Sequence, residues 1–295
     1  MKWDPITVIA LVVGVVAVSS SGALIAYAAA PALAIAFWRN ALATGVLAPV
    51  AVARGEIRGS QWRSALAGLA LAAHFGTWVP SVKLTNIATA TALVCTQPIW
   101  AGLISAARGA RIGRWVWAGM LLAVVGAVIA TGGHLRSGGG REALGDALAL
   151  AGAIAGAVYT ILGERVRQRM TTTAYTTVCY GVCAVTLLAV CLIGGVQMSG
   201  YTAGAWLAII GLTVGPQLLG HSMFNYALHK VSATMLSVIV LVEVPGAIFL
   251  GWVWLGQTVS VTAMAGIALL LAGVAIVVLN PGERIGLHPL PASDL

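Results

Sequence analysis

The sequence predicts an all-α, polytopic membrane protein with ten transmembrane helices arranged as two inverted five-helix repeats. Three observations support this prediction. The 295-residue chain is 60% hydrophobic and 8% charged, whereas an ordinary soluble domain is about 25% charged. Apolar segments near the ~20 residues that cross ~30 Å of hydrocarbon recur along the whole chain. A long stretch of the first half of the chain also recurs in the second half without a gap.

The apolar segments follow one another with short connections. Each is predicted to be a helix, because unpaired backbone groups are too costly in lipid. The segments also lack the shorter, alternating pattern of barrel strands. In chain order they are residues 6–28, 32–53, 63–83, 86–107, 114–132, 144–165, 172–194, 204–227, 232–254 and 262–280.

An internal duplication sets the predicted domain organisation. A shift of 147 positions places His74 to Thr131 on His221 to Val278. The residues that match include His74 with His221, Lys83 with Lys230, and Pro98 with Pro245. The predicted parts are a first five-helix repeat over residues 1–131, a glycine-rich linker over 132–143, a second repeat over 144–281 and a tail over 282–295.

The basic residues predict the orientation of the chain. With the N-terminus in the cytoplasm, twelve of them lie on the inner side and three on the outer side, as the positive-inside rule requires. Both termini are then predicted to be cytoplasmic. The net charge of +8 is spread over short loops, so we expect no nucleic-acid partner. Five helices per repeat is an odd number, so the second repeat enters from the opposite face. Inverted repeats are typical of secondary transporters, whose substrate site lies between the halves.

Two charged residues fall inside predicted membrane segments. Glu243 lies in the middle of segment 232–254, and Arg39 lies about a third of the way into segment 32–53. Charged groups at such depth are costly and are therefore functional candidates. Glu243 is a candidate proton carrier, substrate ligand or static ion-pair partner of Arg39, and the sequence leaves these roles open.

Polar side chains gather on two equivalent segments. His74 and Trp78 are four residues apart, and Gln217, His221 and Asn225 form an i, i+4, i+8 stripe on one face of an α-helix. Such a stripe either makes interhelical hydrogen bonds or lines a cavity, and cavity lining is the hypothesis that we favour.

Pro98 and Pro245 occupy equivalent places in the two repeats. Each removes a backbone hydrogen bond within a predicted helix and frees a carbonyl group. We predict that the two prolines kink their helices and serve as hinges, and that Gln97 faces the cavity beside Pro98.

Several chemical signatures are absent from the sequence. It contains no P-loop, no metal-ligand spacing and no Ser, His and Asp set. We therefore predict no enzyme activity, no cofactor and no metal. The four cysteines lie in apolar segments and are interpreted as small packing residues.

Three stretches carry a family resemblance: residues 31–40, which include Ala-Phe-Trp-Arg-Asn, residues 88–126 and residues 233–273. On these stretches the chain resembles the EamA-type branch of the drug/metabolite transporter superfamily over nearly its whole length. The family commonly carries Glu-Pro on the fourth and ninth helices, followed by Leu-Gly-Glu. The departures from this pattern are Gln97-Pro98, Glu243-Val244-Pro245 and Leu255-Gly256-Gln257.

The resemblance implies a secondary-active exporter of amino acids, other small metabolites or drugs, in a bacterial inner membrane and working by alternating access. It also implies a central cavity formed by the first, third, fourth, sixth, eighth and ninth helices. Carried onto this sequence, the substrate-binding residues would include His74, Trp78, Gln97, Tyr159, His221, Asn225 and Glu243. The polar stripe adds Gln217 to this set.

The expected partners are a small-molecule substrate and the lipid bilayer, with proton coupling as a hypothesis and a monomer or homodimer as the assembly. Two alternatives stay open at this point. An exchanger of nucleotide sugars or triose phosphates would need cationic groups in the cavity, and Arg39 is the one plausible candidate. A lipid-modifying enzyme would need acid, base or metal-ligand residues clustered at one membrane face.

Overall fold

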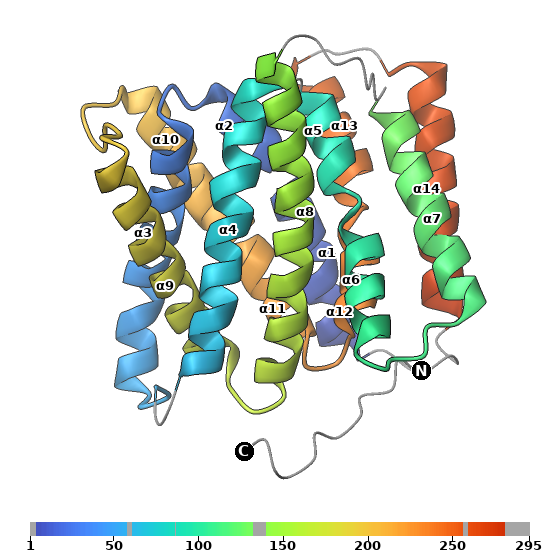
Figure 1. Ribbon diagram of the computed structural model, residues 1–295, viewed down its shortest axis with the longest axis horizontal. Coiled ribbons are helices and arrows are strands. Elements are labelled where there is room, and N and C mark those ends of the chain that lie inside the picture. Colours follow the sequence, from blue (N-terminus) through green and yellow to red (C-terminus); the bar gives the residue numbers. More distant parts are fainter. Residues whose placement is uncertain (1–3, 58–60, 86, 132–139, 256–258, 281–295) are drawn as a thin grey trace.

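A computed structural model describes residues 4–57, 61–85, 87–131, 140–255 and 259–280. Every regular element within these residues is a helix. Nine of the helical stretches described are long and apolar enough to cross a membrane, and Arg114–Ala130 is a shorter apolar helix. The prediction of an all-α, polytopic membrane protein is confirmed. Figure 1 shows the helices side by side in one bundle.

The elements follow the order of the predicted segments. The first half contains α1 (Pro5–Ser19), α2 (Ser21–Tyr27), α3 (Ala32–Ala53), α4 (Trp62–Leu84), α5 (Ile87–Val94), α6 (Gln97–Ala107) and α7 (Arg114–Ala130). The second half contains α8 (Gly140–Arg167), α9 (Thr172–Ile193), α10 (Ala203–Leu212), the π-helix η1 (Thr213–His221), α11 (Ser222–Ala227), α12 (Ala233–Val240), α13 (Glu243–Leu255) and α14 (Val261–Leu279).

Part of the predicted organisation lies outside the described residues. This applies to residues 132–139 of the predicted linker, to residues 281–295, which include the predicted tail, and to Gly256-Gln257. Residues 140–143, also assigned to the linker, instead form the first turn of α8. The C-terminal ends of α3, α6, α8 and α11 lie at one end of the bundle (Figure 1), and the basic residues Arg54, Arg108, Arg165 and Arg167 lie at or beside these ends.

Four of the ten predicted segments are not single α-helices. The first is divided into α1 and α2, the fourth into α5 and α6, and the ninth into α12 and α13, while the eighth contains η1. Pro98, Pro216 and Pro245 lie at or beside three of these irregularities. Proline has no amide hydrogen and its ring crowds the preceding turn, so a regular helix is interrupted there.

Side-chain caps fix where several helices begin. The Asp4 carboxylate accepts from the Thr7 amide at the start of α1, and the Thr171 hydroxyl accepts from the Ala174 amide at the start of α9. Equivalent hydroxyl caps begin α10, α12 and α14. Each cap satisfies a backbone donor that the helix leaves free and is worth about 1 kcal/mol.

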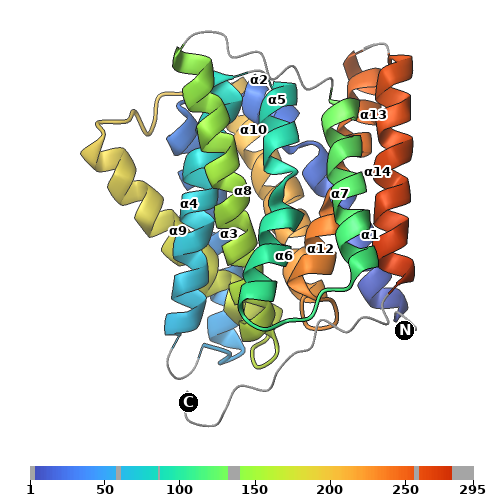
Figure 2. The same cartoon turned by 45° about the vertical axis from the view of Figure 1, so that its right-hand side comes forward.

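Helices α7 and α14, the last of each half, lie side by side at one edge of the bundle (Figures 1 and 2). Glycines bring their backbones together: a Cβ atom on Gly126 would lie 2.7 Å from the Gly266 carbonyl oxygen, and one on Gly119 would lie 2.8 Å from that of Gly273. Under the 147-residue shift Gly119 corresponds to Gly266 and Gly126 to Gly273, so the two contacts are equivalent. They are related as contacts across a pseudo-two-fold axis would be. Small residues allow this approach, which gives van der Waals packing in lipid.

The other long helices pack as α4 against α8 and α3 against α9. Leu71, Phe75 and Val79 on α4 are fully buried, together with Tyr175 and Tyr180 on α9. This apolar layer forms the largest core cluster, and it holds α4 in place beside the cavity described below.

Lys83 has a specific structural role at the end of α4. Its ammonium group donates to the Ala28 carbonyl oxygen at 2.9 Å and to that of Ala26 at 3.3 Å. These carbonyls lie at the C-terminal end of α2, where a helix has free acceptors and a negative partial charge. Lys83 therefore ties the third predicted span to the end of the first.

Candidate functional site

A central cavity lies where the broken helices meet. Its volume is about 80 Å³, which is room for several water molecules. It is lined from α1, α2, α4, the α5–α6 and α12–α13 breaks, α8, η1 and α11, which belong to the first, third, fourth, sixth, eighth and ninth predicted spans. Its polar and aromatic lining residues are Ser21, His74, Trp78, Gln97, Tyr159, Thr160, His221, Phe224, Asn225, Ser237 and Glu243.

Two proline-marked helix breaks lie at this cavity. Pro98 is the second residue of α6 and Pro245 is the third residue of α13. In a regular helix a residue with an N–H at either position would donate to the carbonyl of Val94 or Leu241, which proline cannot do. Val94 and Leu241 both line the cavity. Each proline therefore lies at the start of the second half of a broken helix, and its role as a hinge stays a prediction.

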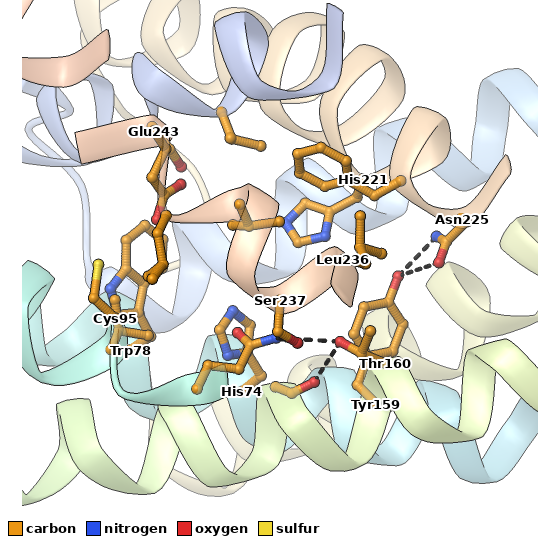
Figure 3. A pocket seen from close by; sticks show the side chains of 18 of the residues that line it. His74, Trp78, Cys95, Tyr159, Thr160, His221, Asn225, Leu236, Ser237 and Glu243 are labelled. Carbon is orange, nitrogen blue, oxygen red and sulfur yellow. Dashed lines mark hydrogen bonds between the residues drawn. The ribbon is translucent and has the colours of Figure 1, made fainter. Parts of the chain in front are cut away.

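Glu243 lies at one end of the cavity, close to Trp78 and Cys95 (Figure 3). As the first residue of α13, it owes its position to the break in the ninth span. Its carboxylate makes no ion pair with any residue that the structure describes. The indole nitrogen of Trp78 is buried and likewise has no hydrogen-bond partner in the described part of the chain.

The equivalent histidines His74 and His221 lie in the middle of the cavity (Figure 3). His74 Nδ1 is 2.8 Å from the Gly152 carbonyl oxygen. A carbonyl oxygen accepts only, so Nδ1 must donate, and in the neutral ring Nε2 is then an acceptor. The His74 ring stacks on Trp78 at 6.1 Å and 7°, while His221 packs edge-on against Phe75 at 5.2 Å.

Gln97 connects three helices across the cavity. Its amide nitrogen donates to the Thr160 hydroxyl on α8 at 3.2 Å and to the Ser237 hydroxyl on α12 at 3.3 Å. Gly156 provides the space, because a Cβ atom there would lie 2.9 Å from Gln97 Oε1 and 3.0 Å from His74 Nδ1. The absence of a side chain at Gly156 therefore shapes the cavity.

The end of the cavity opposite Glu243 is closed by a hydrogen-bonded pair. The Tyr159 hydroxyl donates to Asn225 Oδ1 at 2.9 Å, and Asn225 Nδ2 lies 3.4 Å from the Tyr180 hydroxyl. Figure 3 shows the Tyr159 and Asn225 side chains meeting there. These contacts fix both side chains between α8, α9 and α11.

The prediction that Gln217 shares a cavity-facing stripe with His221 and Asn225 is wrong. Gln217 is fully buried and bonds instead to Arg39 and Asn40 on α3. The reason is η1: its i to i+5 bonding, seen from Gln217 to Ser222, widens the turn. A four-residue spacing then no longer places side chains on one face.

The ion pair between Arg39 and Glu243 is also absent. Arg39 is fully buried, donates through Nε to Gln217 Oε1 at 2.8 Å and stacks over the Phe75 ring at 4.3 Å. It does not line the cavity. Arg39 is thus a buried cation held by an amide and an aromatic face, separated from Glu243.

Of the eight predicted substrate-binding residues, seven line the one cavity, and Gln217 does not. Sequence reasoning missed Thr160 and Ser237, which hold Gln97. Thr160 follows the predicted site residue Tyr159 in the sequence, and this position next to a predicted site residue could have indicated it. Ser237 had no comparable signal, because hydroxyls in membrane helices commonly bond back to their own helix, as Ser237 also does to Ala233.

The lining determines which chemistry fits the cavity. It contains one carboxylate, two histidines and several aromatic faces, and no Arg or Lys among the described lining residues. No group of three or more His, Cys, Asp or Glu in the described chain is arranged to hold a metal. Such a site suits reversible binding of a small organic molecule.

Comparison with known proteins gives a consistent picture. Residues 5–132 and 143–279 match the model of the EamA-like transporter family. An uncharacterized transporter of Archaeoglobus fulgidus is 23% identical over 200 residues, which cover 68% of this chain and 70% of that protein. A protein of known crystal structure, 20% identical, superposes with a TM-score of 0.78 over 92% of this chain and 96% of its own. That structural likeness concerns the fold alone.

Proposed function

This chain belongs to the EamA-like transporter family, and from that premise we propose that it is a secondary-active transporter that exports amino acids, other small metabolites or drugs by alternating access. The family and the Archaeoglobus fulgidus relative point to a transporter rather than an enzyme. The observation that carries the proposal is the cavity at the meeting point of two proline-marked helix breaks, Val94 to Gln97 and Val240 to Glu243.

The breaks suit alternating access. Discontinuous helices near the bilayer midplane are where transporters of this architecture place their substrate sites. Here α5 and α12 end, and α6 and α13 begin, at the cavity. Small rotations at Pro98 and Pro245 would open one side of the cavity and close the other, because a proline-interrupted turn lacks the hydrogen bond that stiffens a helix.

Gradient-driven transport needs a coupling group, and we propose Glu243 for it. A carboxylate without an ionic partner in a buried site can exchange a proton with the cavity. We also propose a bacterial inner membrane as the location. We propose cytoplasmic termini because Arg54, Arg108, Arg165 and Arg167 lie at or beside helix ends that gather at one face of the bundle.

The cavity gives less support to an exchanger of phosphorylated substrates. Phosphates are bound by Arg or Lys, and the described lining has neither. Arg39, the one candidate, is held by Gln217 and Phe75.

Efflux from liposomes tests the proposal. The purified protein is reconstituted into liposomes loaded with a mixture of amino acids, nucleosides and organic cations, and the contents are followed by mass spectrometry with and without an inward proton gradient. We expect one compound class to leave faster than from protein-free liposomes, and faster still with the gradient. Equal efflux from liposomes with and without the protein would contradict transport. Efflux that does not change with the proton gradient would contradict proton coupling and leave the transport proposal standing.

A further inference from the structure

We infer, on the basis of the transport function proposed above, that the central cavity binds an organic cation, a protonated amine, in preference to a zwitterion or an anion. The cation is held between the Glu243 carboxylate and the face of Trp78. The evidence is the balance of charge, of hydrogen-bond donors and of aromatic surface in the cavity.

The balance of charge favours a positive ligand. Glu243 is the one charged side chain among the described residues that line the cavity, and it makes no ion pair with a described residue. Arg39, a buried cation on α3, is engaged by Gln217 and Phe75 and does not line the cavity. An isolated carboxylate in a low-dielectric site is unfavourable unless a cation or a proton joins it, so a cationic ligand can take the place of the proton that Glu243 binds when the cavity is empty.

The balance of donors and acceptors points the same way. The Gln97 amide nitrogen is engaged by Thr160 and Ser237. This leaves the indole N–H of Trp78 as a buried donor without a partner. The carboxylate of an amino acid would find only neutral donors, such as the Trp78 indole N–H and the N–H of the neutral His221 ring, and it would face the Glu243 charge. An ammonium group has three donors and no acceptor, and it would find the Glu243 oxygens and His74 Nε2.

The aromatic surface completes the site. Trp78 and Glu243 both line the cavity, and Figure 3 draws them toward the same end of it. The Trp78 ring is stacked parallel to that of His74. The face of an indole ring attracts an ammonium group. Glu243 and Trp78 therefore provide a charge and a ring face to the same cavity, and Phe224 and Leu236 provide apolar contact for the rest of the amine.

Two matched series of compounds test this assignment by isothermal titration calorimetry on the full-length protein in detergent at pH 7. The first is propylamine, propanol, propionate and alanine, and the second is benzylamine, benzyl alcohol, benzoate and phenylglycine. The two sizes allow for the small volume of the cavity, about 80 Å³. In at least one series we expect the amine to bind at least about ten times more tightly than the alcohol, the carboxylate and the amino acid of that series.

Variants identify the groups responsible. Glu243→Gln is expected to weaken amine binding about 100-fold while leaving the alcohol unchanged, since it removes the partner of a buried charge. Trp78→Leu is expected to weaken amine binding about fivefold. Glu142→Gln, which neutralises an exposed carboxylate at the start of α8, is the matched control and should bind as the wild type does. Thermal unfolding shows whether each variant is folded. If a variant does not fold, the comparison of amine with alcohol in the wild-type protein still tests the assignment.

Three outcomes would overturn the assignment. Tighter binding of the carboxylate or the zwitterion would exclude a cation site and leave the transport proposal standing. An amine preference that survives Glu243→Gln would exclude the Glu243 site. Binding of no compound in either series would reject the amine class, whereas the liposome efflux measurement decides separately whether the protein transports anything.

Discussion

Gly126→Val is expected to destabilise the protein by about 3 kcal/mol or more, near the upper end of the cost of overpacking. A Cβ atom at Gly126 would lie 2.3 Å from the Leu270 amide nitrogen and 2.7 Å from the Gly266 carbonyl oxygen. These are backbone atoms of α14, so no side-chain rotation relieves the clash, and α7 must move away from α14. Denaturant unfolding in detergent, followed by tryptophan fluorescence, measures the change.

The matched control for this prediction is Gly45→Val on α3. A Cβ atom at Gly45 meets nothing within 4 Å, so valine there should change the free energy of unfolding by less than about 1 kcal/mol. Similar values for the two variants would show that the glycine contact between α7 and α14 does not hold the two halves together.

Gly156→Val is expected to reduce the transport rate about 100-fold, because a misplacement of a bound molecule by about 1 Å can lower a rate by this factor. The added methyl groups would enter the space next to Gln97 Oε1 and His74 Nδ1, 2.9 and 3.0 Å from the Cβ position. The contacts of Gln97 to α8 and α12 would be displaced and the cavity filled. The initial rate of efflux from liposomes is the measurement, and Gly156→Ala should lose less.

Gly140→Val provides the control on the same helix, because a Cβ atom at Gly140 has no neighbour within 4 Å. It should transport at the wild-type rate. If Gly156→Val is folded and transports as fast as Gly140→Val, the substrate does not pass through this cavity.

Much of this architecture was predictable, because it depends on patterns repeated over many residues. The membrane spans follow from apolar length, and the break positions follow from Pro98 and Pro245. The register of the duplication matched His74 with His221, and both line the cavity. These predictions did not depend on the orientation of any single side chain.

The failures concern single side chains on irregular backbone. The stripe containing Gln217 assumed a regular α-helix, whereas Thr213–His221 is a π-helix that rotates Gln217 toward Arg39. An ion pair of Arg39 with Glu243 was one of the three roles that the sequence left open for Glu243, and it rested on opposite charge alone. A planar guanidinium can instead use an amide and a ring face, here Gln217 and Phe75, and sequence does not show which of these partners lies within reach.

The most direct test of the central claim, that the cavity opens alternately to the two sides of the membrane, uses the native Cys95. This thiol lines the cavity, and it is one of four free cysteines, all buried. A membrane-impermeant methanethiosulfonate reagent carrying a trimethylammonium group is applied to one side of reconstituted vesicles at a time, with Cys95→Ser as the control for labelling elsewhere. We predict that Cys95 is labelled from either side and that a transported compound slows the labelling. Labelling from one side only, or from neither side while efflux proceeds, would contradict alternating access through this cavity.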